Sequence, residues 1–227
     1  MSESINNREH RQEVMKDIIK QLHDGKTVDD VKDQFDETFG SVSAAEIGAV
    51  EQALIREGMP VSEVQRLCDV HASVFKGSIE EIHQSEDPSI IKGHPAHILK
   101  EENREIEKII KEDIEAYLDD LSSKKNIKKL KQGLEKLSKI DIHYSRKENL
   151  FFPYLEKYGI TGPPQVMWGV DDEIREAIKR VRQILDNGIS DEEVFKTKVK
   201  DLINSVNEMI FKEENILLPM LVDELTQ

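Results

Sequence analysis

The sequence predicts an all-α protein: an up-down-up-down four-helix bundle preceded by a small helical domain. Gly and Pro are few, with 11 and 7 among 227 residues, and aromatic residues make up 5%. This composition favours long helices over a sheet protein with many turns. Apolar residues also recur at helical spacing along most of the chain, with short turn signals between the runs. We therefore expect two helical domains, at residues 10–85 and 94–224.

The small N-terminal domain is predicted from apolar spacing and helix-ending signals. A first helix places Val14 and Leu22 on one apolar stripe and ends near Gly25. Ser43 and Glu46 form a capping box that opens another helix. Residues 83–93 contain Pro and Gly without periodicity, so we expect the domain boundary there.

The only cysteine lies in a Cys-x-x-His pair, Cys68 and His71, within an apolar helical stretch. A zinc site would need a second pair of ligands, and small cysteines are often buried, so we interpret both as packing residues. One cysteine cannot form an internal disulfide, which favours a reducing compartment and a cytoplasmic location. The N-terminus shows no apolar signal segment, which agrees with that location.

Charge and hydropathy exclude several classes of partner. The net charge of -14 argues against a nucleic-acid interface, which needs a basic surface, and against anionic membranes. No apolar run approaches the roughly 20 residues needed to span a bilayer, so membrane insertion is not expected. The chain also carries no recognisable nucleophile–base pair, phosphate loop or nucleotide motif, and we do not expect an enzyme.

Four long helices follow the boundary, over residues 95–121, 126–155, 164–186 and from about 190 to the C-terminus. Each carries an apolar stripe, and Asn187-Gly188 followed by the capping box Ser190–Glu193 separates the last two. Because the connections are short, neighbouring helices should be antiparallel. The start of the first, the end of the second, the start of the third and the end of the fourth should then share one end of the bundle.

Polar side chains interrupt the apolar stripes at that shared end. They are Glu102, Asn103, His143, Tyr144, Glu148, Asp171, Glu213 and Glu214, with Met167 and Met209 beside them. A buried carboxylate is costly unless it is paired or bound to metal, and converging acids with an imidazole suit iron or zinc. In the alternative interpretation the helix ends are solvated, and Arg146, Lys147 and Arg175 pair with the acids.

A short repeat strengthens the expectation of a shared site. KENLFFP at residues 147–153 matches EENILLP at residues 213–219, so Glu148 aligns with Glu214 and Pro153 with Pro219. Two helices that each carry an acid five residues before a proline are consistent with one polar site inside a bundle.

These segments resemble the hemerythrin-like (HHE cation-binding) family, in which a His is followed four or five residues later by Glu and then by an LFP-type ending. The resemblance covers residues 94–224. The stretches LHDGKTVDDVKDQF, EIGAVEQALIREGMPV and RLCDVHASVFKG resemble the DUF438 domain, which often precedes this family's bundle. The resemblance implies a four-helix metal-binding domain.

Carried over residue by residue, the resemblance retains few imidazoles. The family's histidines on the first and fourth helices fall on Asn103 and Met209, and Lys147 stands where the family often has Glu. Only His143 stands at its expected place, so an imidazole-rich oxygen carrier is not expected. The implied metal ligands are His143, Glu148, Asp171 and Glu214, helped by His94 or His97. The implied cofactor-lining residues are Glu102, Asn103, Tyr144, Met167, Trp168 and Met209.

Three functional hypotheses follow. The first is a metal-binding protein with a redox, O2, NO or iron sensing or binding role, its cofactor being di-iron or mononuclear non-haem iron, with zinc as an alternative. The second is a haem site using His143 and Met209, both of which are acceptable axial ligands. The third is a metal-free interaction module with a degenerate site. The expected partners are a metal ion or small diatomic ligand and a signalling protein.

Overall fold

The structure is a computed structural model that describes residues 2–27, 30, 31, 34, 39, 44–61, 64 and 92–225. These residues form helices, with no strand among them, and the predicted all-α class is confirmed. Cys68, His71 and most of the predicted boundary lie outside the described residues. The chain divides into two compact units, one of residues 1–83, 152–169 and 212–227 and one of residues 84–151 and 170–211.

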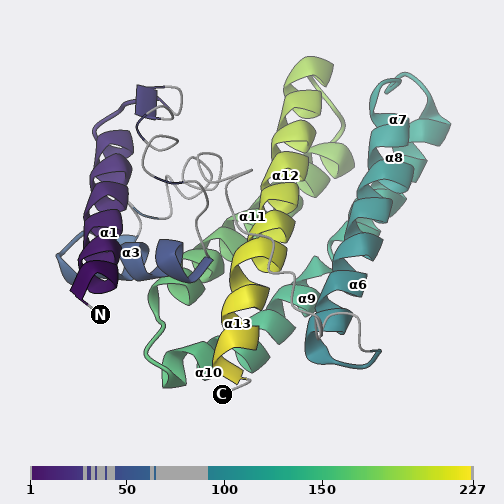
Figure 1. Cartoon of the computed structure of the whole chain (residues 1–227). Coiled ribbons are helices and arrows are strands. Elements are labelled where there is room, and N and C mark those ends of the chain that lie inside the picture. The colour runs from purple at the N-terminus through teal and green to yellow at the C-terminus, as the bar shows by residue number, and fades with distance from the viewer. Residues whose placement is uncertain are drawn as a thin grey trace. The chain divides into compact units, whose positions relative to one another are not determined.

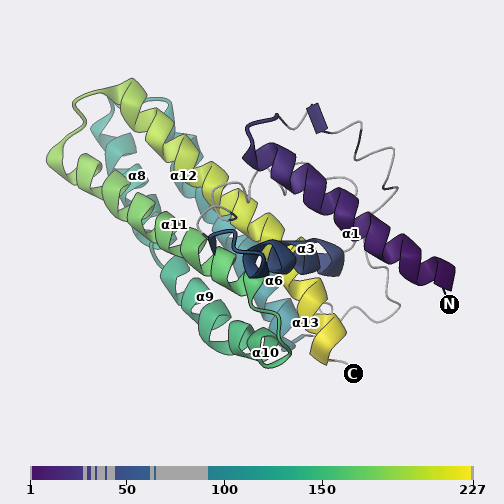
Figure 2. The ribbon, with the colours of Figure 1, turned by 90° about the vertical axis from the view of Figure 1, so that its left-hand side faces the viewer.

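The second unit contains four helical segments whose axes are roughly aligned (Figures 1 and 2). Among the described residues three π-helical stretches interrupt the α-helices, and two of them lie in this unit. The first segment is α6 (Pro95–Ile109), η2 (Ile110–Glu115) and α7 (Ala116–Leu118). The second is α8 (Lys124–Leu137), α9 (Ile140–Arg146) and η3 (Lys147–Phe151). The third and fourth are α11 (Gly162–Asn187), which belongs here from Val170 on, and α12 (Glu192–Lys212).

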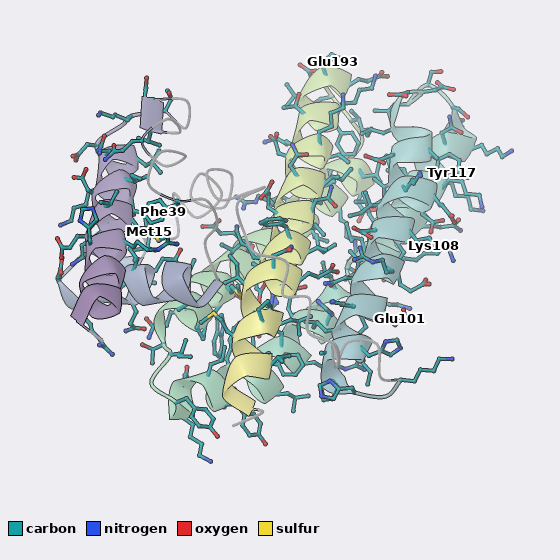
Figure 3. All side chains as sticks on the ribbon, viewed as in Figure 1. Met15, Phe39, Glu101, Lys108, Tyr117 and Glu193 are labelled. Carbon is teal, nitrogen blue, oxygen red and sulfur yellow. The ribbon has the colours of Figure 1, made fainter. Side chains whose placement is uncertain are left out.

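The start of α6 follows from its sequence. Pro95 occupies the first turn, where its missing N–H costs no hydrogen bond, and the Nδ1 of His94 accepts a hydrogen bond from the Ala96 N–H at 3.2 Å. His94 is therefore the N-cap residue of α6. Leu99 and Ile106 then lie buried on the inner face, while Glu101 and Lys108 project outward from α6 (Figure 3).

Close packing of α8 against η2 depends on a glycine. A Cβ added at Gly133 would lie 2.7 Å from the Asp113 carbonyl carbon and closer still to its oxygen. No side chain fits there without moving the backbone of one helix, so Gly133 sets the distance between the first two segments. Leu130, Leu134 and Leu137 complete the buried face of α8.

The first unit combines N-terminal helices with chain segments from much later in the sequence. Its apolar core includes Met15, Phe39 and Leu54, and Met15 and Phe39 lie close together in Figure 3. Its elements are α1 (Ser2–His23), α3 (Ala44–Arg56), α10 (Phe152–Lys157), the start of α11, η4 (Glu213–Leu217) and α13 (Leu218–Leu225). Within the described part of the chain, no helix has the length and apolar character needed to cross a membrane.

Candidate functional site

A buried polar layer lies inside the second unit, on three of its four segments. Asn103 from α6, His143 from α9, Lys147 and Glu148 from η3, and Asp171 from α11 are all buried. Apolar stripes flank these positions, as the sequence predicted. Burial without a partner is costly for each of these groups, so their contacts decide what the layer can do.

His143 is oriented by a carboxylate from the neighbouring helix. Its Nδ1 lies 2.8 Å from Glu102 Oε2, and the second oxygen of Glu102 accepts a hydrogen bond from the Arg146 guanidinium. His143 is almost fully buried, whereas Arg146 extends to the surface. Glu102 thus bridges a buried imidazole and an exposed guanidinium, and α6 is tied to α9 at this level.

Lys147 and Asp171 form an ion pair that is closed to solvent. Lys147 Nζ donates to Asp171 Oδ1 at 2.8 Å, and both side chains are 0% exposed. The same ammonium lies 4.3 Å from the centre of the Tyr144 ring, a cation–π distance. The polar layer therefore contains the ammonium group of Lys147 as a buried cation.

Arg175 occupies both carboxylate oxygens of Glu148, so Glu148 is not available as a metal ligand. Its guanidinium donates to both Glu148 oxygens, at 2.7 and 3.0 Å, and to Asp141 at 2.7 Å and Asp172 at 2.9 Å. Burial opposes the charged form of Arg175, but the hydrogen bonds to Glu148 and Asp141 outweigh it and raise the pKa of this guanidinium above its usual value. The bidentate geometry is the strong form of this pair.

The other predicted site residues are distributed over both units. In the second unit Met209 is fully buried, and His97 and His143 both line a groove of about 400 Å³ between α6 and the α8–α9 segment. In the first unit Met167 is buried, Glu214 is half-buried and Trp168 is 46% exposed. Trp168 therefore does not form the wall of a buried pocket.

The first unit contains two further buried charges, of which the sequence pattern had indicated Glu213 but not Lys212. Lys212 and Glu213 are 0% exposed, although the metal ligand predicted on that helix was Glu214. The signal was present in the repeat, because the same alignment that pairs Glu148 with Glu214 pairs Lys147 with Glu213. Lys147 and Glu213 also occupy the first position of the π-helical stretches η3 and η4. Such stretches occur often at functional sites.

The donor set does not fit a metal centre as it stands. Among the described residues, no three His, Cys, Asp or Glu side chains are grouped so that they could hold a metal ion. In the second unit Glu102 is engaged by Arg146 and His143, Glu148 by Arg175, and Asp171 by Lys147. These acids pair with Arg146, Lys147 and Arg175, as the alternative interpretation expected, but Lys147 and Asp171 are buried rather than solvated.

The first unit contains a hydrogen-bonded junction at the start of α11. Gln52 Oε1, on α3, accepts hydrogen bonds from the Thr161 N–H at 3.1 Å, the Thr161 hydroxyl at 3.0 Å and the Gly162 N–H at 2.6 Å. The first N–H groups of a helix lack partners within the helix. Gln52 therefore caps α11 from a residue more than a hundred positions away in the sequence.

We expect Gln52→Ala to lower the free energy of unfolding by about 1–3 kcal/mol, because it removes the acceptor of three donors. Gln52→Glu keeps an oxygen acceptor and adds a negative charge that the helix N-terminus favours, so its stability should stay close to that of the parent. Thermal unfolding of both variants, followed by circular dichroism, measures the difference. An alanine variant as stable as the parent would contradict this role of Gln52.

Comparison with known families identifies two segments. Residues 94–221, more than half of the chain, match the family described as Hemerythrin HHE cation binding domain. Residues 15–81 match a family of unknown function, DUF438. Both matches agree with the resemblances found in the sequence. No curated protein and no solved structure matched the chain.

Proposed function

Because the chain belongs to the hemerythrin HHE cation binding domain family, whose bundle implies metal binding, typically of iron, we propose that it is a remodelled, regulatory member of that family. In this proposal the protein is neither an oxygen carrier nor an enzyme, and side-chain cations take the place of a metal in its polar layer. The observation that carries the proposal is the Lys147–Asp171 pair, which is fully closed to solvent.

The energetics of burial support this assignment. Two opposite charges taken out of water must satisfy each other almost completely, since each ion loses several kcal/mol of hydration. Lys147 and Asp171 meet at 2.8 Å, and Arg175 holds Glu148 with two hydrogen bonds. A layer in which each of these carboxylates already has a cation needs no metal to offset its charge.

The regulatory part of the proposal rests on the junction at α11. This helix begins at the cap provided by Gln52 of α3, within the segment matched by DUF438, and nine residues after Gly162 it carries Asp171. One continuous helix thus links the N-terminal family segment to the polar layer along the chain. A signalling protein that binds the N-terminal segment is the partner we propose.

A second candidate function is an iron, O2 or NO sensor centred on His143. The pairing of His143 Nδ1 with Glu102 favours it, because imidazoles that bind metals usually donate their other ring N–H to a carboxylate. His97 and Glu101 line the same groove as His143. In this case His143, oriented by Glu102, would contribute the imidazole ligand of a single ion, which would provide a redox-active or Lewis-acidic centre.

Metal analysis and the optical spectrum of the freshly purified full chain test the proposal. We expect iron and zinc well below one per chain, no Soret band and no oxo-bridged iron bands, both as purified and after incubation with Fe(II) and desalting. One iron per chain that is lost in His143→Ala, with helical circular dichroism intact, would establish the sensor instead. A Soret band would establish the haem hypothesis.

A further inference from the structure

We infer that the Lys147 ammonium is the resident cation of the polar layer, and that this one residue keeps a divalent metal from binding between His143 and Asp171. The inference deepens the proposed function and rests on it. It adds a residue that decides metal specificity in a domain of a cation-binding family.

The position of the ammonium is defined by contacts on two sides. It lies 2.8 Å from Asp171 and 4.3 Å from the centre of the Tyr144 ring, and Tyr144 is itself buried. Arg175 approaches the same ring at 5.6 Å. The Lys147 side chain has no exposed surface, so its charge interacts with these groups and not with solvent.

His143 lies one helical turn before Lys147 and on the same side of the helix. The Lys147 backbone N–H donates to the His143 carbonyl, so α-helical geometry joins the two residues even though a π-helical stretch begins at Lys147. Side chains four apart on a helix lie next to each other. A metal-binding side chain at position 147 would therefore lie beside the His143 imidazole and opposite Asp171.

Lysine prevents metal binding at this position in two ways. A zinc or iron ion needs deprotonated N, O or S donors at roughly 2.0–2.3 Å, and a protonated amine offers none. The ammonium also repels a second cation strongly, since charges interact far more strongly inside a protein than in water. Replacing Lys147 with a metal-binding residue removes the repulsion and supplies a third donor beside His143 and Asp171.

The test compares Lys147→Glu and Lys147→His with the parent, as full-length chains. Zn(II) and Fe(II) binding is measured by calorimetry and by metal content after desalting, and folding by circular dichroism with and without Zn(II). The matched control is Lys131→Glu, which makes the same charge change in an exposed pair with Asp186 at 2.5 Å, away from the groove that His143 lines. A second control adds His143→Ala to each Lys147 variant.

We expect the Lys147 variants to bind one Zn(II) per chain at least tenfold more tightly than the parent, and their melting temperature to rise when Zn(II) is added. Lys131→Glu should behave as the parent, and His143→Ala should abolish the gain. Lys147→His adds a metal donor without a buried negative charge. If Lys147→Glu folds only with metal, the affinity of Lys147→His for Zn(II) tests the inference. Folded Lys147 variants that bind no more tightly than the parent would overturn the inference, as would variants that Zn(II) cannot refold.

The outcome is separable from the test of the proposed function. A parent protein that carries stoichiometric iron would overturn the proposed function whatever the variants do. A metal-free parent whose Lys147 variants also remain metal-free would overturn only the inference about Lys147.

Discussion

Lys147→Met should lower the free energy of unfolding by about 3–5 kcal/mol, the range expected when one partner of a buried ion pair is removed. The substitution keeps most of the side-chain volume but leaves the Asp171 carboxylate buried without its ammonium. Denaturation by urea, followed by helical circular dichroism, measures the loss from the shift of the midpoint at constant slope.

Two comparisons separate the charge effect from a packing effect. The double variant Lys147→Met with Asp171→Leu removes both charges and should recover most of the lost stability, since apolar replacements of buried pairs are often neutral or better. Lys136→Met breaks an exposed pair and should cost at most about 1 kcal/mol. A single Lys147→Met variant that loses no more than Lys136→Met would contradict the buried-pair interpretation.

Gly133→Ala should destabilise the bundle by about 1–3 kcal/mol or more, the usual cost of overpacking. The added methyl group would collide with the backbone of Asp113, so α8 and η2 must separate or one of them must bend. The intrinsic preference of alanine for helices, about 1 kcal/mol over glycine, acts in the opposite direction.

The matched control for Gly133→Ala is Gln132→Ala, one residue earlier on the exposed face of α8. Its effect should stay within about 0.5 kcal/mol. If Gly133→Ala were as stable as this control, or more stable, then the close contact between α8 and η2 would not limit the packing of the bundle. Thermal unfolding of the two variants side by side answers the question.

The sequence alone determined the fold class and most helix positions. Apolar residues at helical spacing predicted segments at 95–121, 126–155 and 164–186, and the structure begins α6 at Pro95 and ends α11 at Asn187. These signals are local: a cap, a proline or a glycine acts within one or two turns. The motifs at residues 143–153 and 209–219 were likewise sufficient for the family, because they are contiguous in the chain.

The sequence also indicated part of the polar layer. His143, Glu148 and Asp171 interrupt apolar stripes, and all three are buried in the second unit. It could not show that Arg175, 27 positions after Glu148, would hold that acid. Helical periodicity gives the face of one helix, but it does not give the rotation of that helix against its neighbour.

Only the tertiary structure decided how the layer is neutralised. Lys147 follows His143 by four residues and reads from the sequence as a surface cation, yet it is completely buried against Asp171, 24 residues later. His143 likewise pairs with Glu102, which lies 41 residues earlier in the chain. The pairing of a buried charge depends on which side chains three helices bring within about 3 Å, and that distance is set by packing between helices rather than by any local preference of the chain.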